Sequence, residues 1–371
     1  MATAQALYRQ SAEFWERLEA AKRGIEGIAW YPYCSLANFE HFVPLLGADS
    51  DFTALLGGGP ILDVGCADGD LSFFVESLGS AGPMIHALDH AGANHNELLG
   101  ITALKRALGS GVEIHNLNLD EGFELPARQQ PYSMAFCLGL LYHVKNPFHL
   151  LESLSRYARS CLLSTRIMRR FPGGELVPAH PAAYLLDPDE LNSDETNFWI
   201  FNEAGLRRLV SRAGWQLERF HSTGGGGGAS DPDSLMNDER AFLLLRSRRW
   251  LANITLGFGW HEESPEGWRW TERRFSFSLA PWCPWRKLTL RFHLPEAVIA
   301  KTGPLTLTLA AGLGSYRAAE AGMHTFSAAS IPATGGAATP GNIECELDGC
   351  LPPSVEDDRE LGIVVIGVDY E

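Results

Sequence analysis

The chain has 371 residues, of which 45% are hydrophobic and 20% are charged, a balance typical of folded globular proteins. This length exceeds what a single core usually needs, so we expect two domains. The formal net charge of −15 at pH 7 disfavours a nucleic-acid partner, although an acidic protein can still carry a local basic patch. No apolar run is long enough to span a bilayer.

The amino terminus is too polar for a signal peptide, because glutamates interrupt every apolar run in residues 1–23. The seven cysteines lack the CxxC spacing of a metal site. We therefore expect a cytoplasmic protein with reduced thiols and no bound metal ion.

Two helices and an aromatic loop are predicted before residue 59. Residues 3–23 form the first helix, because Leu7, Phe14 and Leu18 recur at helical spacing with charges between them. A loop with several aromatic residues covers 24–35, and a second helix covers 36–46. Residues 1–58 are thus expected to form a helical cap.

From residue 60 the pattern alternates between short apolar strands and amphipathic helices. The predicted strands are 61–64, 84–88, 112–117, 134–141, 161–165, 215–220 and 241–245. The predicted helices are 71–78, 98–108, 150–158 and 202–213, the last ended by Gly214. This alternation predicts an α/β domain over residues 59–247, with a seven-stranded, Rossmann-like sheet covered on both faces.

The sequence pattern changes near residue 250, where runs of β-forming residues separated by Gly and Pro replace the helical patterns. These runs are 275–279, 287–292, 305–310 and 361–368. They predict an all-β, sandwich-like accessory domain over residues 250–371. Its many tryptophans either fill the core of that domain or stack on sugar rings, and the sequence leaves both options open.

The sharpest motif is the turn Asp63-Val64-Gly65-Cys66-Ala67-Asp68-Gly69-Asp70, which follows the first strand. Glycines at such a turn let the backbone approach a ligand closely. In a dinucleotide fingerprint the third glycine would stand where this chain has Asp70, and an acid there repels a pyrophosphate. A cofactor with a cationic sulfonium and no phosphate avoids that repulsion, so the turn favours S-adenosylmethionine over NAD.

Acidic residues also follow the next two strands of the predicted sheet. Asp89 ends the second strand, where a carboxylate can accept hydrogen bonds from both ribose hydroxyls. Asp120 follows the third strand, where an acid can face an adenine amino group. Because ligands of such sheets lie outside the carboxyl ends of the strands, we expect Cys66, Leu119 and Leu138 to line the same crevice.

Residues 60–246 resemble the class I S-adenosylmethionine-dependent methyltransferases, and more closely the family that modifies the wobble uridine of tRNA by methyl or carboxymethyl transfer. The segment Leu138-Gly139-Leu140-Leu141-Tyr142-His143-Val144-Lys145-Asn146-Pro147 is similar to that family's Gly-x-Leu-Tyr-His-x-x-x-Pro segment. Residues 176–178, 201–206 and 239–241 also fall where the family has related sequence.

The resemblance implies cofactor contacts from the turn and from the strand-end acids, namely Asp63, Gly65, Ala67, Gly69, Asp89 and Asp120. It also implies that Tyr142 lies near the transferring group, with Arg240 not far away. Ala67 stands where the family usually has a glycine. Carboxymethyl-transferring members use a lysine just before their aromatic loop, and residues 24–33 contain none, which favours methyl transfer.

Other side chains are candidates for the acceptor side of the site. His143 is the candidate base for a hydroxyl acceptor, because an unperturbed imidazole titrates near neutrality. Tyr31 and Tyr33 are expected to close over the site, while Arg166 and Trp199 flank an insertion that serves as a candidate acceptor lid.

Three functions remain open at this stage. The first is methyl transfer to an O or N nucleophile of a small-molecule or glycan acceptor. The second is tRNA wobble-uridine modification, which the net charge of −15 does not favour because RNA binding needs a basic surface. The third is a non-catalytic scaffold with a methyltransferase-like fold, against which the acids at three strand ends argue. The oligomeric state is open.

Overall fold

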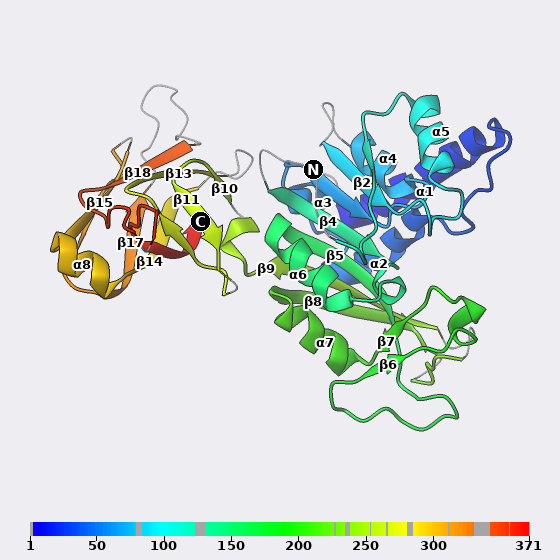
Figure 1. Cartoon of the computed structure of the whole chain (residues 1–371). Helices are drawn as coiled ribbons and strands as arrows, with labels where there is room; N and C mark the ends of the chain where they lie inside the picture. Colours follow the sequence, from blue (N-terminus) through cyan, green and yellow to red (C-terminus); the bar gives the residue numbers. More distant parts are fainter. Residues whose placement is uncertain are drawn as a thin grey trace. The chain divides into compact units, whose positions relative to one another are not determined.

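The computed structural model describes residues 3–78, 84–122, 131–225, 228–233, 238–252, 254–264, 266–279, 285–310, 312–329, 342–355 and 357–370. The chain divides into two compact units, one reaching to Arg248 and the other beginning at Arg249 (Figure 1). None of the helices within these ranges is long and apolar enough to cross a membrane. The cysteines described are free thiols, and Cys283 lies outside the described residues.

The first unit contains seven α-helices and nine strands among its described residues. The helices are α1 (Ala4–Arg23), α2 (Asn38–Leu46), α3 (Phe52–Leu56), α4 (Asp70–Ser77), α5 (Leu99–Leu108), α6 (Pro147–Tyr157) and α7 (Glu203–Arg212). The strands are β1 (Ile61–Val64), β2 (Ile85–Asp89), β3 (Glu113–Asn116), β4 (Tyr132–Leu138), β5 (Ala158–Ile167), β6 (Ala183–Leu185), β7 (Trp199–Phe201), β8 (Trp215–Gly224) and β9 (Glu239–Ser247).

The predicted α/β class is confirmed by the sheet. Its core runs in the order β3-β2-β1-β4-β5 with parallel pairing, and β9 and β8 add antiparallel strands beyond β5. The sheet has nine strands and not seven, because the insertion folds into β6 and β7, which join it through the pairing of Ile167 with Phe201. Three-residue strands carry too little periodicity to be predicted from sequence.

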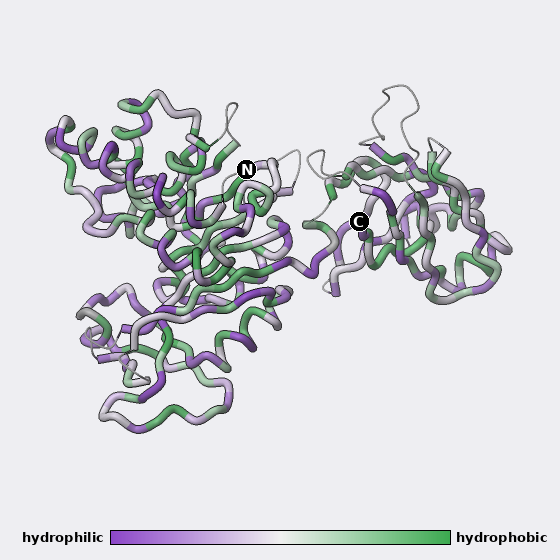
Figure 2. Tube along the Cα trace, turned by 180° about the vertical axis from the view of Figure 1, so that it is seen from behind, coloured by the Kyte–Doolittle hydropathy of each residue, from purple (hydrophilic) through white to green (hydrophobic). Residues whose placement is uncertain are grey.

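Helices cover both faces of this sheet, as the alternation of side chains along β1 shows. Ile61 packs in a core shared with α1, α2, α4 and α5, whereas Leu62 packs with α6 and α7. Hydrophobic and hydrophilic stretches alternate along the chain in both units (Figure 2). The carboxyl ends of β1, β2 and β4 therefore stand side by side at one edge.

The second unit is the expected β-sandwich, with two antiparallel five-stranded sheets in the orders β10-β13-β18-β15-β16 and β11-β12-β19-β14-β17. Its strands are β10 (Ile254–Leu256), β11 (Trp260–Glu263), β12 (Arg269–Thr271), β13 (Arg274–Leu279), β14 (Lys287–Leu294), β15 (Leu305–Leu309), β16 (Gly314–Ala318), β17 (Gly322–Ala329), β18 (Asn342–Leu347) and β19 (Val364–Tyr370). One short helix, α8 (Glu296–Thr302), interrupts a region expected to be purely β.

Tryptophans of this unit contribute to its core. Trp260 packs edge-on against Phe275, with ring centroids 5.1 Å apart, and its indole N–H donates to the Ser276 carbonyl at 2.6 Å. Trp285 is buried in the same core. For these two side chains the structure favours packing over sugar stacking.

Candidate active site

The turn after β1 adopts the backbone shape that the glycine motif predicts. Gly65 and Gly69 have φ values of +75° and +81°, and Ala67 has a φ of +50°. A Cβ at Gly69 would lie 2.7 Å from the Ile101 side chain, so both this contact and the positive φ favour glycine there. Ala67 adopts a left-handed conformation that glycine tolerates better, which gives a physical reason for the glycine usual at this place.

Asp89, at the end of β2, lies directly against this turn. Its Oδ2 accepts a hydrogen bond from the Ala67 N–H at 2.7 Å and another from the Asn94 amide at 3.2 Å. Its Oδ1 accepts from the His90 N–H at 2.8 Å. Burial raises the pKa of Asp89, while these donors oppose the rise. The carboxylate is thus held in place with lone pairs left for a further donor.

Asp63 and Cys66 lie beneath the turn. Asp63 accepts a hydrogen bond from the Ser72 hydroxyl at 2.6 Å and is almost fully buried, and burial raises its pKa to about 7. Cys66 is buried in the core between the sheet and α4, and burial raises the pKa of its thiol. Both side chains therefore support the turn from within, and Asp63 does so through its bond to Ser72.

Tyr142 and Arg240 come together above the end of β4, although 98 positions separate them. The Arg240 Nη1 donates to the Tyr142 hydroxyl at 3.4 Å, and Arg240 also pairs with Asp238 at 3.3 Å. A Cβ at Gly139 would make only an ordinary contact with that hydroxyl, at 3.5 Å, so it is the φ of +70° that favours glycine there. The site thus places a phenol and a guanidinium opposite the glycine turn.

Tyr31 joins the same region from the amino-terminal segment. Burial raises the pKa of Tyr31 to about 12, and the nearby Tyr142 and Asp89 add to the rise. Tyr33 is 71% exposed and touches Tyr31 edge-on at 6.1 Å. Tyr31 therefore lies over the crevice, whereas Tyr33 stands outside it.

His143 follows Tyr142 in a 3-10 turn, Leu141–His143, and has a defined tautomer. The Thr196 hydroxyl donates to Asp194 at 2.6 Å, so its oxygen is left to accept from the His143 Nδ1–H at 2.9 Å. The Nε2 then carries the lone pair. Burial lowers the pKa of His143, while Asp194 and the Thr196 backbone oppose the drop. This imidazole is therefore neutral near pH 7 and able to accept a proton.

A buried ion network, missed by the sequence analysis, ties the amino-terminal helix to the turn. The Lys22 Nζ lies 3.2 Å from Asp70 and 4.0 Å from Asp68. Asp68 also accepts from the Tyr31 N–H at 2.7 Å and from the Asn96 amide at 2.7 Å. Asp68 and Asp70 belong to the turn motif, but the sequence could not predict their pairing with Lys22 because 48 positions separate Lys22 from Asp70.

Replacing Lys22 with methionine is expected to lower the free energy of unfolding of this domain by about 2 kcal/mol. Asp70 and Asp68 would lose the cation that pairs with them in a buried setting. Removing one partner of a fully buried ion pair usually destabilises a protein by more than this. The effect is smaller here because Lys22 also borders a cavity, where water partly screens the charges. Urea unfolding measures the change. Arg23→Met, an exposed neighbour on the same helix, is the control, and equal losses in the two variants would contradict the role of the network.

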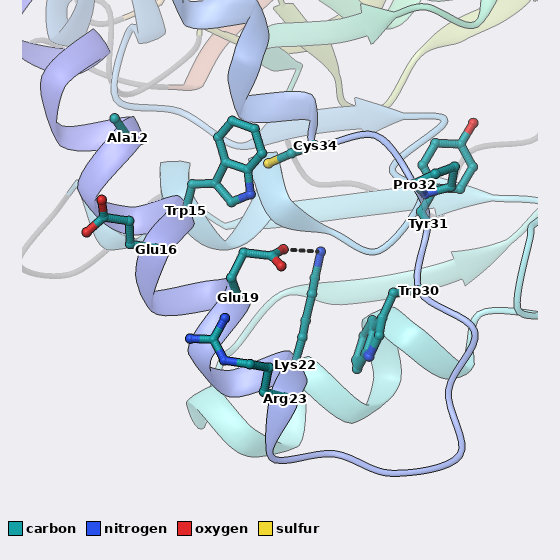
Figure 3. Close-up of a pocket in the computed structure, with 10 residues that line it drawn as sticks. All are labelled: Ala12, Trp15, Glu16, Glu19, Lys22, Arg23, Trp30, Tyr31, Pro32 and Cys34. Atoms are coloured by element: carbon teal, nitrogen blue, oxygen red, sulfur yellow. Dashed lines mark ion pairs between the residues drawn. The ribbon is translucent and has the colours of Figure 1, made fainter.

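A cavity of ≈ 970 Å³ lies beside this network, between α1 and the following aromatic segment (Figure 3). Trp15, Glu16 and Glu19 line it from α1, and Trp30 and Tyr31 line it from the loop. The Lys22 Nζ pairs with Glu19 at 3.5 Å inside it. Tyr31 thus borders both the cavity and the crevice above Asp89.

The remaining expected site residues take other places. Arg166 is buried and pairs with Asp238 at 3.1 Å, so it is not a free clamp for a substrate anion. Trp199 donates its indole N–H to the Lys145 carbonyl at 3.1 Å. Asp120 accepts from the Lys145 N–H at 2.7 Å, which joins the loops after β3 and β4. Leu119 and Leu138 are half-buried against the core beneath these loops.

Several known proteins resemble part of this chain. A family model described as "Methyltransferase domain" matches residues 39–219. The chain is 30% identical over 169 residues to a tRNA U34 carboxymethyltransferase of Ectopseudomonas mendocina, covering 43% of this chain and 46% of that protein. It is 31% identical over 127 residues to a ubiquinone biosynthesis O-methyltransferase of Paraburkholderia phymatum, covering 33% and 50%. The chain spans about half the length of these curated relatives.

A solved structure of the N-terminal domain of EvdMO1, with SAH bound, aligns with 63% of this chain and 96% of its own, at 18% identity and a TM-score of 0.41. The segment matched by the family model contains the glycine turn, Asp89 and the Tyr142-His143 pair. Residues 39–219 are therefore similar to a methyltransferase domain.

Proposed function

We propose that this protein transfers a methyl group from S-adenosylmethionine to an oxygen or nitrogen nucleophile of a small-molecule or glycan acceptor in the cytoplasm. The observation that carries the proposal is the position of Asp89 against a glycine turn, with Tyr142 and His143 at the end of the adjacent β4. S-adenosylmethionine supplies a methyl group already activated by its sulfonium.

The charges around the turn support this cofactor. Asp63, Asp68, Asp70 and Asp89 all lie at or beneath it, and the one cation that reaches them, Lys22, is shared among Asp70, Asp68 and Glu19 in the part of the chain that the structure describes. This excess of carboxylates around the turn disfavours a pyrophosphate and tolerates a sulfonium and an amino group. The acceptor position left on the Asp89 Oδ1 suits a ribose hydroxyl.

The protein groups in the crevice support transfer to a positioned nucleophile. Methyl transfer is an in-line displacement, so alignment and exclusion of water supply much of the rate. The neutral His143, held through Thr196 and Asp194, presents its Nε2 to remove a proton from a hydroxyl acceptor. Tyr142 and Arg240 orient the acceptor by hydrogen bonding.

The cavity beside Tyr31 supports a small acceptor. Its volume of ≈ 970 Å³ suits a compact molecule, and its lining mixes indole rings with carboxylates and with the cations of Lys22 and Arg23. Such walls favour an amphipathic acceptor over an extended phosphate polymer.

Incubation of the full chain with isotope-labelled S-adenosylmethionine tests the proposal. We expect label to enter compounds of a panel of hydroxylated and amino-bearing small molecules and sugars, and not to enter tRNA. Label in tRNA alone would replace the proposal by the second candidate. A chain that fails to bind S-adenosylmethionine in calorimetry would be a scaffold and no enzyme of this class.

The second candidate is tRNA wobble-uridine modification, which the names of the tRNA U34 carboxymethyltransferase relatives favour. Those enzymes' names imply a cofactor with an added carboxylate. In this chain Lys22 lies close to the aromatic loop but already pairs with three acids, and Arg240 already pairs with Asp238.

We therefore expect plain S-adenosylmethionine to bind at least about tenfold more tightly than its carboxylated form, because a desolvated carboxylate without a free cation is unfavourable. Competition calorimetry measures the ratio. As a control, S-adenosylhomocysteine, which lacks the transferred group, should bind in both the parent chain and Arg240→Gln. A preference of the parent for the carboxylated cofactor would show that Arg240 and Tyr142 do receive that group.

A further inference from the structure

Two histidines and a glutamate gather on one face of the sheet, at the edge formed by β2 and β3. His86 stands opposite Glu113 in the parallel pairing of the two strands, and His115 stands opposite Leu88. Because residues two apart on a strand share a face, all three side chains lie on the face that carries Leu62 and Val64. This is the opposite face from Asp63, so the group is separate from the cofactor turn.

The three ligand atoms converge. The Nε2 of His86 lies 3.5 Å from the Glu113 Oε2, and the Nε2 of His115 lies 3.8 Å from the same oxygen. All three atoms lie within 4.8 Å of one another. In a tetrahedral zinc site, with bonds of about 2.0–2.2 Å, ligand atoms lie about 3.3 Å apart, so a small inward movement of these side chains suffices.

The Nε2 atoms of the two imidazoles have no hydrogen-bond partner among the described residues. His86 is 4% exposed, yet its Nε2 has no hydrogen-bond partner, and neither has the buried Nε2 of His115. Buried polar nitrogens in proteins are nearly always paired, so two such orphans aimed at one carboxylate need an explanation.

A neighbouring residue orients the most buried ligand. The Tyr132 hydroxyl lies 2.7 Å from the His86 Nδ1. When the Nδ1–H donates to this hydroxyl, the lone pair is on Nε2, the atom that faces Glu113. Metal-bound histidines usually have such a partner on the other ring nitrogen.

We propose that His86, Glu113 and His115 form a binding site for a divalent transition-metal ion, for which Zn²⁺ is the natural probe. Two imidazole nitrogens and one carboxylate oxygen are ligands that Zn²⁺ accepts readily, with a fourth position open to water. The expectation of no metal rested on the absence of CxxC spacing and of a paired histidine pattern in the sequence. Histidines on neighbouring strands, 29 positions apart, have no recognisable spacing in the sequence.

The experiment uses the full chain, treated with a chelator and dialysed, then titrated with ZnCl₂ in calorimetry. The variants are Glu113→Gln and His115→Gln, which keep the sheet because both side chains reach solvent. His149→Gln and Glu40→Gln, exposed residues elsewhere in the same unit, are the matched controls for nonspecific binding. Thermal unfolding with and without Zn²⁺ gives a second readout.

We expect one equivalent of Zn²⁺ to bind the parent chain and both controls, and to raise their unfolding temperature. Each ligand variant should bind at least about tenfold more weakly, since even the loss of a supporting partner has effects of that size. Cobalt should give a visible spectrum with the parent that Glu113→Gln weakens. A parent that takes up no stoichiometric Zn²⁺, or ligand variants that bind it as tightly as the parent, would overturn the site.

Discussion

Replacing His143 with glutamine is expected to slow methyl transfer to a hydroxyl acceptor by about 10²–10⁴-fold. Glutamine keeps the volume and polarity of the side chain, but it has no nitrogen that can take up the proton. The affinity for S-adenosylmethionine, measured by calorimetry, should stay close to that of the parent. Equal turnover by the variant and the parent would show that His143 supports only the backbone.

The pH profile separates a base from a structural residue. The base form of His143 is the neutral imidazole, which prevails above its pKa, and burial lowers that pKa. Activity should therefore persist as the pH falls through the ordinary histidine value of about 6.5 and decline only below it. Since Asp194 raises the pKa of His143, Asp194→Asn should move the acid limb of kcat/KM to still lower pH. A limb that does not move would contradict the pathway from Asp194 through Thr196 to His143.

The second large effect is expected at Asp89. Replacing it with alanine should weaken the binding of S-adenosylmethionine by about 2 kcal/mol or more, roughly 30-fold, because hydrogen bonds to a charged acceptor are lost. The structure adds a reason, since Asp89 also accepts from Ala67 and His90 and so holds the turn in place. Calorimetry of the parent and the variant measures the change.

Asp89→Asn distinguishes the two contributions. The amide oxygen can still accept from one backbone N–H, but the side chain loses its charge and one acceptor. We expect an affinity between those of the parent and Asp89→Ala. Asp49→Ala, an exposed aspartate outside the site, should leave binding unchanged. An Asp89→Ala variant that binds the cofactor as tightly as the parent would remove Asp89 from the proposed site.

The sequence alone determined the classes of the two units and the glycine turn. Strand and helix periodicities are local, so they revealed the alternating pattern of residues 60–246 and the β-rich pattern after 250. The position of Asp89 next to the turn followed from the rule that parallel strands end at one edge of a sheet, and its bond to the Ala67 N–H agrees with that rule.

The tertiary structure alone decided which distant side chains meet. Lys22 and Asp70 are 48 positions apart, and His143 and Thr196 are 53 apart. Arg166 was expected beside the acceptor lid, and its pairing with Asp238, 72 positions away, is visible only in the folded chain. Periodicity records which face of an element a residue occupies, but not which other element packs there. The choice of partner depends on how the helices and strands pack, and for that reason the ion network, the orientation of His143 and the His86–Glu113–His115 cluster emerged only from the folded chain.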